Sequence, residues 1–169
     1  MSDEPQIVHR AEQPYLAIRT TVSMPKLATD VPPLHAELSG WLGQNGIVPV
    51  GPPFWRYAEF QAGDLVEVEV EVGLPVPTAD QGAGDERVRP GVLPAGRYAT
   101  TVHTGHPTEL GAATAALLDW AERNGVAWDV TEDATSSRWA ARLETYLTDP
   151  AVEPDLSRWQ TELAIKIAG

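Results

Sequence analysis

The chain of 169 residues contains one short pattern twice, and this internal repeat limits the folds that it can adopt. The segment WLGQNGI at 41–47 matches WAERNGV at 120–126: each has a tryptophan, then Asn-Gly at the same spacing, then a β-branched residue. Each segment ends a run with apolar residues at helical spacing, and a proline, Pro33 or Pro107, stands near the start of each run. Because Asn-Gly after such a run is typical of a helix C-terminus with a left-handed glycine, the pattern predicts two equivalent helices.

The segments around the two helices repeat as well. A strand-like segment rich in threonine and aromatic residues precedes each helix, at 14–23 and at 96–104. Two further strand-like segments follow each helix, and they are 54–60 and 65–73 in the first half and 138–147 and 158–167 in the second. Each half therefore predicts the order strand, helix, strand, strand.

The fold class that this order predicts is α+β, built from duplicated β-α-β-β units. One such unit leaves an apolar sheet face uncovered unless its helix and its twin cover it. Two units side by side would form one antiparallel-rich sheet of about eight strands, with two helices on one face and a ligand groove on the other. We expect a single domain over 1–169, with pseudo-repeats at about 6–77 and 92–168 and a Gly- and Pro-rich linker at 78–91.

Composition and charge limit the partners of this chain. The formal net charge of −12 argues against direct binding of nucleic acid, which needs clustered Lys and Arg, and it fits a cationic or neutral ligand. No segment approaches about 18 consecutive apolar residues, so we expect no membrane partner and no secretory signal. The absence of cysteine excludes disulfides and agrees with a cytoplasmic location. We expect no cofactor and no metal, since His103 and His106 lack the further ligands that zinc requires.

The segment 65–73, LVEVEVEVG, alternates valine and glutamate. In an extended chain its valines share one face and its three glutamates share the other. We expect the valines to face the helices and the glutamates to form a solvated negative rim on the groove side.

The same alternation selects a candidate site. In 138–147 and 158–167 the more apolar series should face the helices, which would place Glu144, Tyr146 and Glu162 on the opposite face. A carboxylate among aromatic rings can hold a lipophilic cation, because a ring face attracts positive charge and a desolvated carboxylate neutralises it. Solvent exposure of the glutamates and core packing of the aromatics are the alternatives. The aromatic residues expected near the same groove are Phe54, Trp55, Tyr57 and Trp139.

Five motifs carry a resemblance to a known family. They are GPPFWRY (51–57), VGLPV (72–76), LPAGRYATTVHTGH (93–106), ETYLTDP (144–150) and WQTEL (159–163). In this order they resemble the GyrI-like small-molecule-binding domain, a group that includes effector-binding domains of AraC-type and multidrug-sensing regulators. The resemblance implies a duplicated fold with a groove between the halves, lined by aromatics and carrying an acidic residue that meets cationic, lipophilic ligands.

The resemblance also implies roles for single residues. The acidic residue of the groove would be Glu144, with Tyr146 beside it. Glu162 is similar to a glutamate of a subgroup whose members include hydrolases of cyclopropane-bearing, DNA-alkylating natural products. We see no room for the helix-turn-helix that such regulators carry, so we do not expect direct transcriptional control.

Three functions stay open from the sequence. The first is a stand-alone protein that holds bulky aromatic, often cationic, compounds against the candidate aromatics and a glutamate. The second is a hydrolase that detoxifies electrophilic cyclopropanoid-type compounds in the same groove, with Glu144, Glu162 and Tyr146 as its catalytic residues. The third is a gyrase-inhibitor-like protein with gyrase or another protein as its partner.

Overall fold

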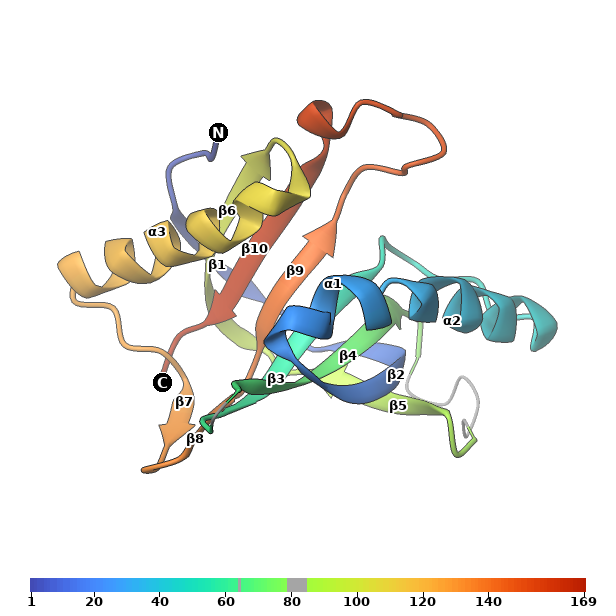
Figure 1. The fold of residues 1–169 in the computed structure, drawn as a ribbon, viewed down its shortest axis with the longest axis horizontal. Helices are drawn as coiled ribbons and strands as arrows, with labels where there is room; N and C mark the ends of the chain where they lie inside the picture. Colours follow the sequence, from blue (N-terminus) through green and yellow to red (C-terminus); the bar gives the residue numbers. More distant parts are fainter. Residues whose placement is uncertain (64, 79–84) are drawn as a thin grey trace.

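A computed structural model describes residues 1–63, 65–78 and 85–169 of the chain and shows one curled sheet (Figure 1). The strands of the main path are β1 (Gln6–Arg10), β2 (Gln13–Ser23), β3 (Phe54–Gln61), β4 (Glu67–Pro75), β5 (Val88–Leu93), β6 (Gly96–Thr104), β9 (Arg142–Tyr146) and β10 (Gln160–Lys166). They pair in the order β1-β6-β10-β9-β3-β4-β2-β5, and every pair is antiparallel. A hairpin of β7 (Val130–Glu132) and β8 (Ser136–Trp139) adds to β3.

The two long helices are those of the repeat, α2 (Pro33–Gln44) and α3 (Leu110–Arg123). Both end as the sequence predicts: Gly46 and Gly125 follow the helices with φ angles of 66° and 67°. In both, the next residue donates its N–H to a carbonyl oxygen five positions back at 2.9 Å. The short helices are α1 (Leu27–Asp30) and the 3₁₀ turns η1 (Met24–Lys26), η2 (Pro107–Glu109) and η3 (Leu156–Arg158). Among the described residues, no helix is long and apolar enough to cross a membrane.

The duplicated order of strand, helix and two strands is confirmed as β2-α2-β3-β4 and β6-α3-β9-β10. The expected strand at 138–147 is divided, because Ser136–Trp139 form β8 of the extra hairpin and only Arg142–Tyr146 form β9. Each half also has a leading strand that the sequence did not predict. β1 leads into β2 but pairs with β6, and β5 leads into β6 but pairs with β2. The halves therefore exchange their leading strands, and they also meet directly where β3 pairs with β9. Residues 79–84 of the expected linker lie outside the described residues, and its last residues belong to β5. β5 resembles a turn in sequence because it contains Pro90 and Gly91, which an edge strand tolerates.

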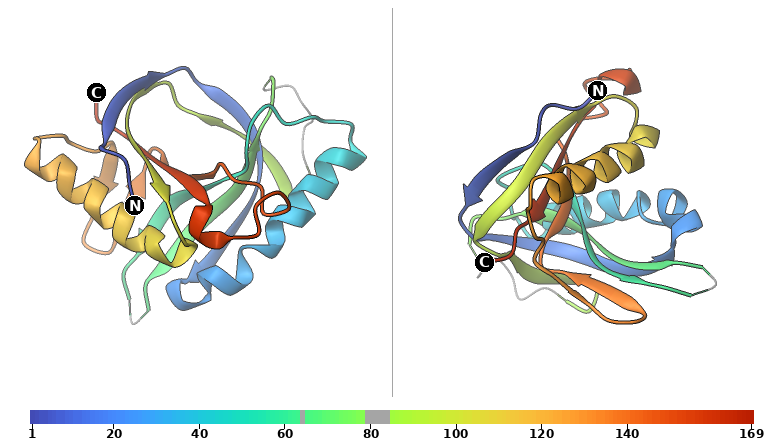
Figure 2. Two further views of the ribbon diagram at one scale, coloured as in Figure 1. Left: turned by 90° about the horizontal axis from the view of Figure 1, so that it is seen from above. Right: turned by 90° about the vertical axis from the view of Figure 1, so that its left-hand side faces the viewer.

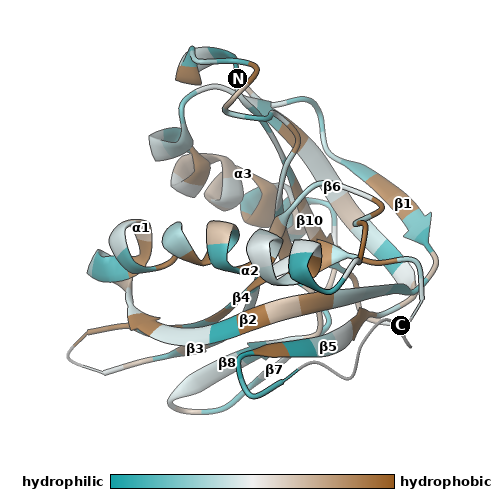
Figure 3. Ribbon diagram, turned by 90° about the vertical axis from the view of Figure 1, so that its right-hand side faces the viewer, coloured by the Kyte–Doolittle hydropathy of each residue, from teal (hydrophilic) through white to brown (hydrophobic). Residues whose placement is uncertain are grey.

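Both long helices cover the same face of the sheet, as expected, and lie apart from each other over its two ends (Figure 2). Under α2, the alternating valines Val68, Val70 and Val72 have no exposed surface, which confirms the side that they face. Burying each valine side chain contributes roughly 1.5–3 kcal/mol. Under α3, Leu163 and Ile165 of β10 form the matching part of the core. Hydrophobic and hydrophilic segments follow one another along β2 (Figure 3). Its Leu16 and Ile18 belong to the core under α2, and its Tyr15 and Ala17 belong to a second core on the other face.

The glutamates of β4 lie on the face away from the helices, but of the three only Glu67 is exposed as the expected rim requires, whereas Glu69 is half-buried and Glu71 is buried. Glu71 is only 6% exposed, and its Oε1 accepts a hydrogen bond of 2.8 Å from the Tyr15 hydroxyl. Arg56 Nη1 lies 3.8 Å from the same oxygen, and Arg19 Nη2 lies 3.5 Å from Oε2. Arg19 also pairs with Glu69 at 3.2 Å. Two arginines therefore offset the like charges that alternation in the sequence placed in one row.

Candidate functional site

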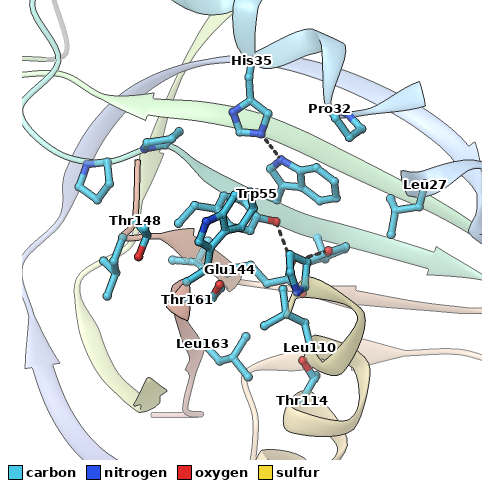
Figure 4. Close-up of a pocket in the computed structure, with 18 of the residues that line it drawn as sticks. Leu27, Pro32, His35, Trp55, Leu110, Thr114, Glu144, Thr148, Thr161 and Leu163 are labelled. Atoms are coloured by element: carbon cyan, nitrogen blue, oxygen red, sulfur yellow. Dashed lines mark hydrogen bonds between the residues drawn. The ribbon is translucent and has the colours of Figure 1, made fainter. Parts of the chain in front are cut away.

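A cavity of about 1380 Å³ opens between α2 and α3, over the central strands of the sheet (Figure 4). The expected groove on the other face is therefore misplaced: this cavity lies on the face that the helices cover. The helices diverge and leave β3, β9 and β10 uncovered between them (Figure 2), so the space is closed by helix on two sides and by sheet below. Its lining includes Leu27, His35, Trp55, Tyr57, Phe60, Leu110, Thr114, Arg142, Glu144, Tyr146, Trp159, Thr161 and Leu163.

Glu144 and Tyr146 line this cavity, whereas Glu162 does not. The register of β9 against β10 places the two glutamates on opposite faces of the sheet. The expectation that all three residues share the face away from the helices is wrong for Glu144 and Tyr146. The expectation assumed that the more apolar side of each strand faces the helices. The far face has an apolar core of its own, to which Leu143 belongs, so the more apolar side of β9 is the side away from the helices. On that far face Glu162 pairs with Arg10 at 2.8 Å, beside a smaller hollow of about 510 Å³.

The other candidate aromatics divide in the same way. Trp55 and Tyr57 line the cavity from β3. Phe54 lies on the far face, where its ring meets the ring of Tyr15 edge-on at 5.2 Å. Trp139 is buried in the core under α3 and is absent from the cavity lining. In the part of the chain that the structure describes, no three His, Cys, Asp or Glu side chains gather as metal ligands.

Glu144 is held by two phenols. The Tyr146 hydroxyl donates a hydrogen bond of 2.7 Å to Oε1, and the Tyr57 hydroxyl donates one of 3.0 Å to the same oxygen. Burial raises the pKa of the Glu144 carboxyl, although these hydrogen bonds and the charge of Arg142 oppose the shift. Burial and the neighbouring carboxylate raise the pKa of both tyrosines well above the usual range, so they stay hydrogen-bond donors. Oε2 accepts no hydrogen bond from any described residue, so this oxygen is free to accept one.

His35 also lines the cavity and is not among the site residues that the sequence predicts. Trp55 donates its indole N–H to His35 Nε2 at 2.6 Å, so this nitrogen carries no proton. Burial lowers the pKa of His35 and favours the same neutral form. The ring of Tyr146 packs edge-on against both, with centroids 5.9 Å from His35 and 5.6 Å from Trp55. The sequence signal that could have indicated His35 is its position in the first predicted helix. It directly follows Leu34 and lies about one turn before Leu38, and both of these leucines are buried against the sheet.

We expect the folded protein to lose stability as the pH falls below about 6.5, in part through His35. Its pKa is lower in the folded state than in the unfolded chain, so between the two values the unfolded chain binds more protons. Replacing His35 with Gln keeps an acceptor for the Trp55 indole and removes the titration. Urea unfolding from about pH 8 to about pH 5.5 should show the wild type losing more stability than the variant. Parallel pH profiles would contradict this assignment.

Comparison with solved structures shows the same fold in several proteins. The C-terminal domain of EcmrR is 20% identical, with a TM-score of 0.75 over 98% of this chain and 97% of that one. EcmrR in its complex with DNA matches with the same identity and TM-score over 97% of this chain, which spans only 57% of the EcmrR chain. A hydrolase from Listeria innocua is 16% identical, with a TM-score of 0.60 over 98% of this chain and 92% of its own.

A further solved structure is that of SAV2435 bound to tetraphenylphosphonium. It is 9% identical, with a TM-score of 0.61 over 99% of this chain and 95% of that one. No curated protein matches the chain by sequence. The family model of the GyrI-like small molecule binding domain matches residues 3–168, nearly the whole chain, and the protein belongs to this family.

Proposed function

We propose that this protein binds bulky aromatic, often cationic, small molecules in the cavity between α2 and α3. The observation that carries the proposal is a half-buried carboxylate, that of Glu144, in a large cavity with mainly apolar and aromatic walls. Family membership supports a small molecule as the ligand. The tetraphenylphosphonium bound to SAV2435, a protein of the same fold, supports a lipophilic cation in particular.

The chemistry of the cavity favours such a ligand in two ways. The rings of Trp55, Tyr57 and Tyr146 offer apolar surface and negative faces to a cation. The free oxygen of Glu144 can neutralise the cation in a setting where water screens the charges poorly. The net charge of −12 raises the local concentration of cations around the protein.

Isothermal titration of the protein with tetraphenylphosphonium tests this function. We expect saturable one-to-one binding with a dissociation constant in the micromolar range. The same titration with tetraphenylborate, an anion of nearly the same shape, should give far weaker binding. Equal affinity for both ions would contradict the role of the carboxylate, and no binding of either would contradict the function.

We infer hydrolysis of a cyclopropane-bearing electrophile as the second candidate function, because Glu144 combines a raised pKa with a hydrogen bond from Tyr146. Water would add its oxygen to one ring carbon and lose a proton to Glu144 as the strained C–C bond breaks. Tyr146 would give a proton to the departing electron pair and regain one from Glu144 through their 2.7 Å hydrogen bond. Glu162, proposed from the sequence as a second catalytic residue, lies on the other face of the sheet from this pair.

Incubation with a cyclopropanoid alkylating agent separates turnover from binding. If the protein is a hydrolase, mass spectrometry should show ring-opened, water-added product in excess of protein, and Glu144→Gln should reduce its rate to that of the buffer. Ring opening by Glu144→Gln at the wild-type rate would eliminate the enzymatic candidate. It would leave the binding function intact.

A further inference from the structure

Arg142 is a second charged residue of the cavity, two positions before Glu144 on the same face of β9. Its guanidinium lies between two aromatic rings, 4.7 Å from the centre of Phe60 and 4.6 Å from the centre of Trp139. Such contacts restrict the rotamers of the side chain without using its N–H groups, which lie along the edge of the guanidinium plane. The residue is half-buried.

Arg142 has no polar partner within the described part of the protein. Arg56 and Arg138 each pair with a glutamate, whereas Arg142 forms no ion pair and donates no hydrogen bond to any described residue. The single buried side-chain nitrogen or oxygen without a partner in the described ranges is Arg56 Nε, so the nitrogens of Arg142 remain accessible. Arg142 is also one of the residues that line the cavity.

An arginine that packs between aromatic rings and has no anionic partner can bind an anion at low cost. Its fork of N–H groups matches a carboxylate bidentately, and the rings on either side already restrict its rotamers, so little further ordering is needed on binding. Partial burial makes the bare cation unfavourable, and burial accordingly lowers the pKa of Arg142. An anionic oxygen at this position would offset that cost.

We propose that Arg142 forms a second subsite, for a carboxylate of the ligand, so that the cavity prefers aromatic compounds that carry both a cationic group and a carboxylate. This inference rests on the proposed binding function and narrows it from cations to zwitterions. Glu144 and Arg142 are two residues apart along a strand, about 7 Å. One rigid aromatic molecule can therefore meet both groups at once, its positive group toward Glu144 and its carboxylate toward Arg142.

Two fluorescent probes isolate the contribution of the carboxylate. Rhodamine 110 carries a free carboxylate on a cationic aromatic system, and rhodamine 123 is its methyl ester. Fluorescence polarisation should show the wild type binding rhodamine 110 about five- to tenfold more tightly than rhodamine 123, since a charge-assisted, bidentate contact is made to the former alone. In Arg142→Met this preference should disappear.

The affinity ratio of the two dyes keeps the test valid even if a variant is partly unfolded, because both affinities then fall together. Arg123→Met is the matched control: it removes one positive charge from the exposed side of α3, outside the cavity lining, and should keep the wild-type ratio. A wild type without preference for rhodamine 110, or an unchanged ratio in Arg142→Met, overturns this inference and leaves the proposed function standing. Failure of the wild type to bind either dye overturns both.

Discussion

Replacing Glu144 with Gln should weaken the binding of tetraphenylphosphonium about tenfold or more. Glutamine has nearly the same shape, and its side-chain oxygen can still accept hydrogen bonds from Tyr57 and Tyr146, which donate to Glu144 Oε1 at 3.0 Å and 2.7 Å. The substitution therefore removes the charge and spares the walls of the cavity. Titration calorimetry measures the change in the dissociation constant. We choose about pH 7.5 because it lies well above the ordinary pKa of a carboxyl.

Glu162→Gln is the matched control for this substitution. It removes the same charge from the same sheet, but Glu162 lies on the far face and pairs with Arg10. Screening by salt and the intervening sheet should keep its affinity within about twofold of the wild type. Equal losses in the two variants would show that the ligand responds to overall charge rather than to the Glu144 carboxylate. Triphenylphosphine oxide, a neutral compound with three phenyl rings, should bind the wild type and Glu144→Gln alike.

Replacing Arg56 with Met should reduce the free energy of unfolding by about 3 kcal/mol, the largest effect on stability that we expect from a single charged residue. Arg56 donates hydrogen bonds to the Tyr15 hydroxyl at 2.7 Å and, across the boundary between the halves, to the Ala140 carbonyl at 2.6 Å. Among the described residues, its loss leaves the buried carboxylate of Glu71 with the partly exposed Arg19 as its one remaining counter-ion. Urea denaturation followed by circular dichroism measures the change.

Arg138→Met provides the comparison, since Arg138 also joins the two halves through an ion pair, with Glu59 at 2.9 Å. The side chain of Arg138 is 67% exposed and that of Arg56 is 18% exposed, so we expect a cost of no more than about 1 kcal/mol for Arg138→Met. Adding Glu71→Gln to Arg56→Met should cost less than the sum of the single changes, because no unpaired buried charge then remains. Similar costs for Arg56→Met and Arg138→Met would contradict a structural role for the buried network.

Local patterns in the sequence determined the helices and their ends. Asn-Gly at 45–46 and at 124–125 requires a left-handed glycine at the same point of each half, and the two φ angles agree within a degree. The valines of β4 were placed correctly because their alternation with glutamate leaves one side that can be buried. The strands β1 and β5 were missed because their pairing partners are in the other half, at a distance in sequence that no local pattern reports.

The sequence by itself determined the duplicated units, the family resemblance and the pair Glu144 and Tyr146 as neighbours on one strand face. Only the tertiary structure decided which face that is, and that Glu162 lies on the other. Alternation fixes which residues of a strand share a side, but it identifies the helix-covered side only when the opposite side is polar. In this protein the central strands carry apolar residues on both faces, so the register between β9 and β10 and the gap between α2 and α3 placed the cavity.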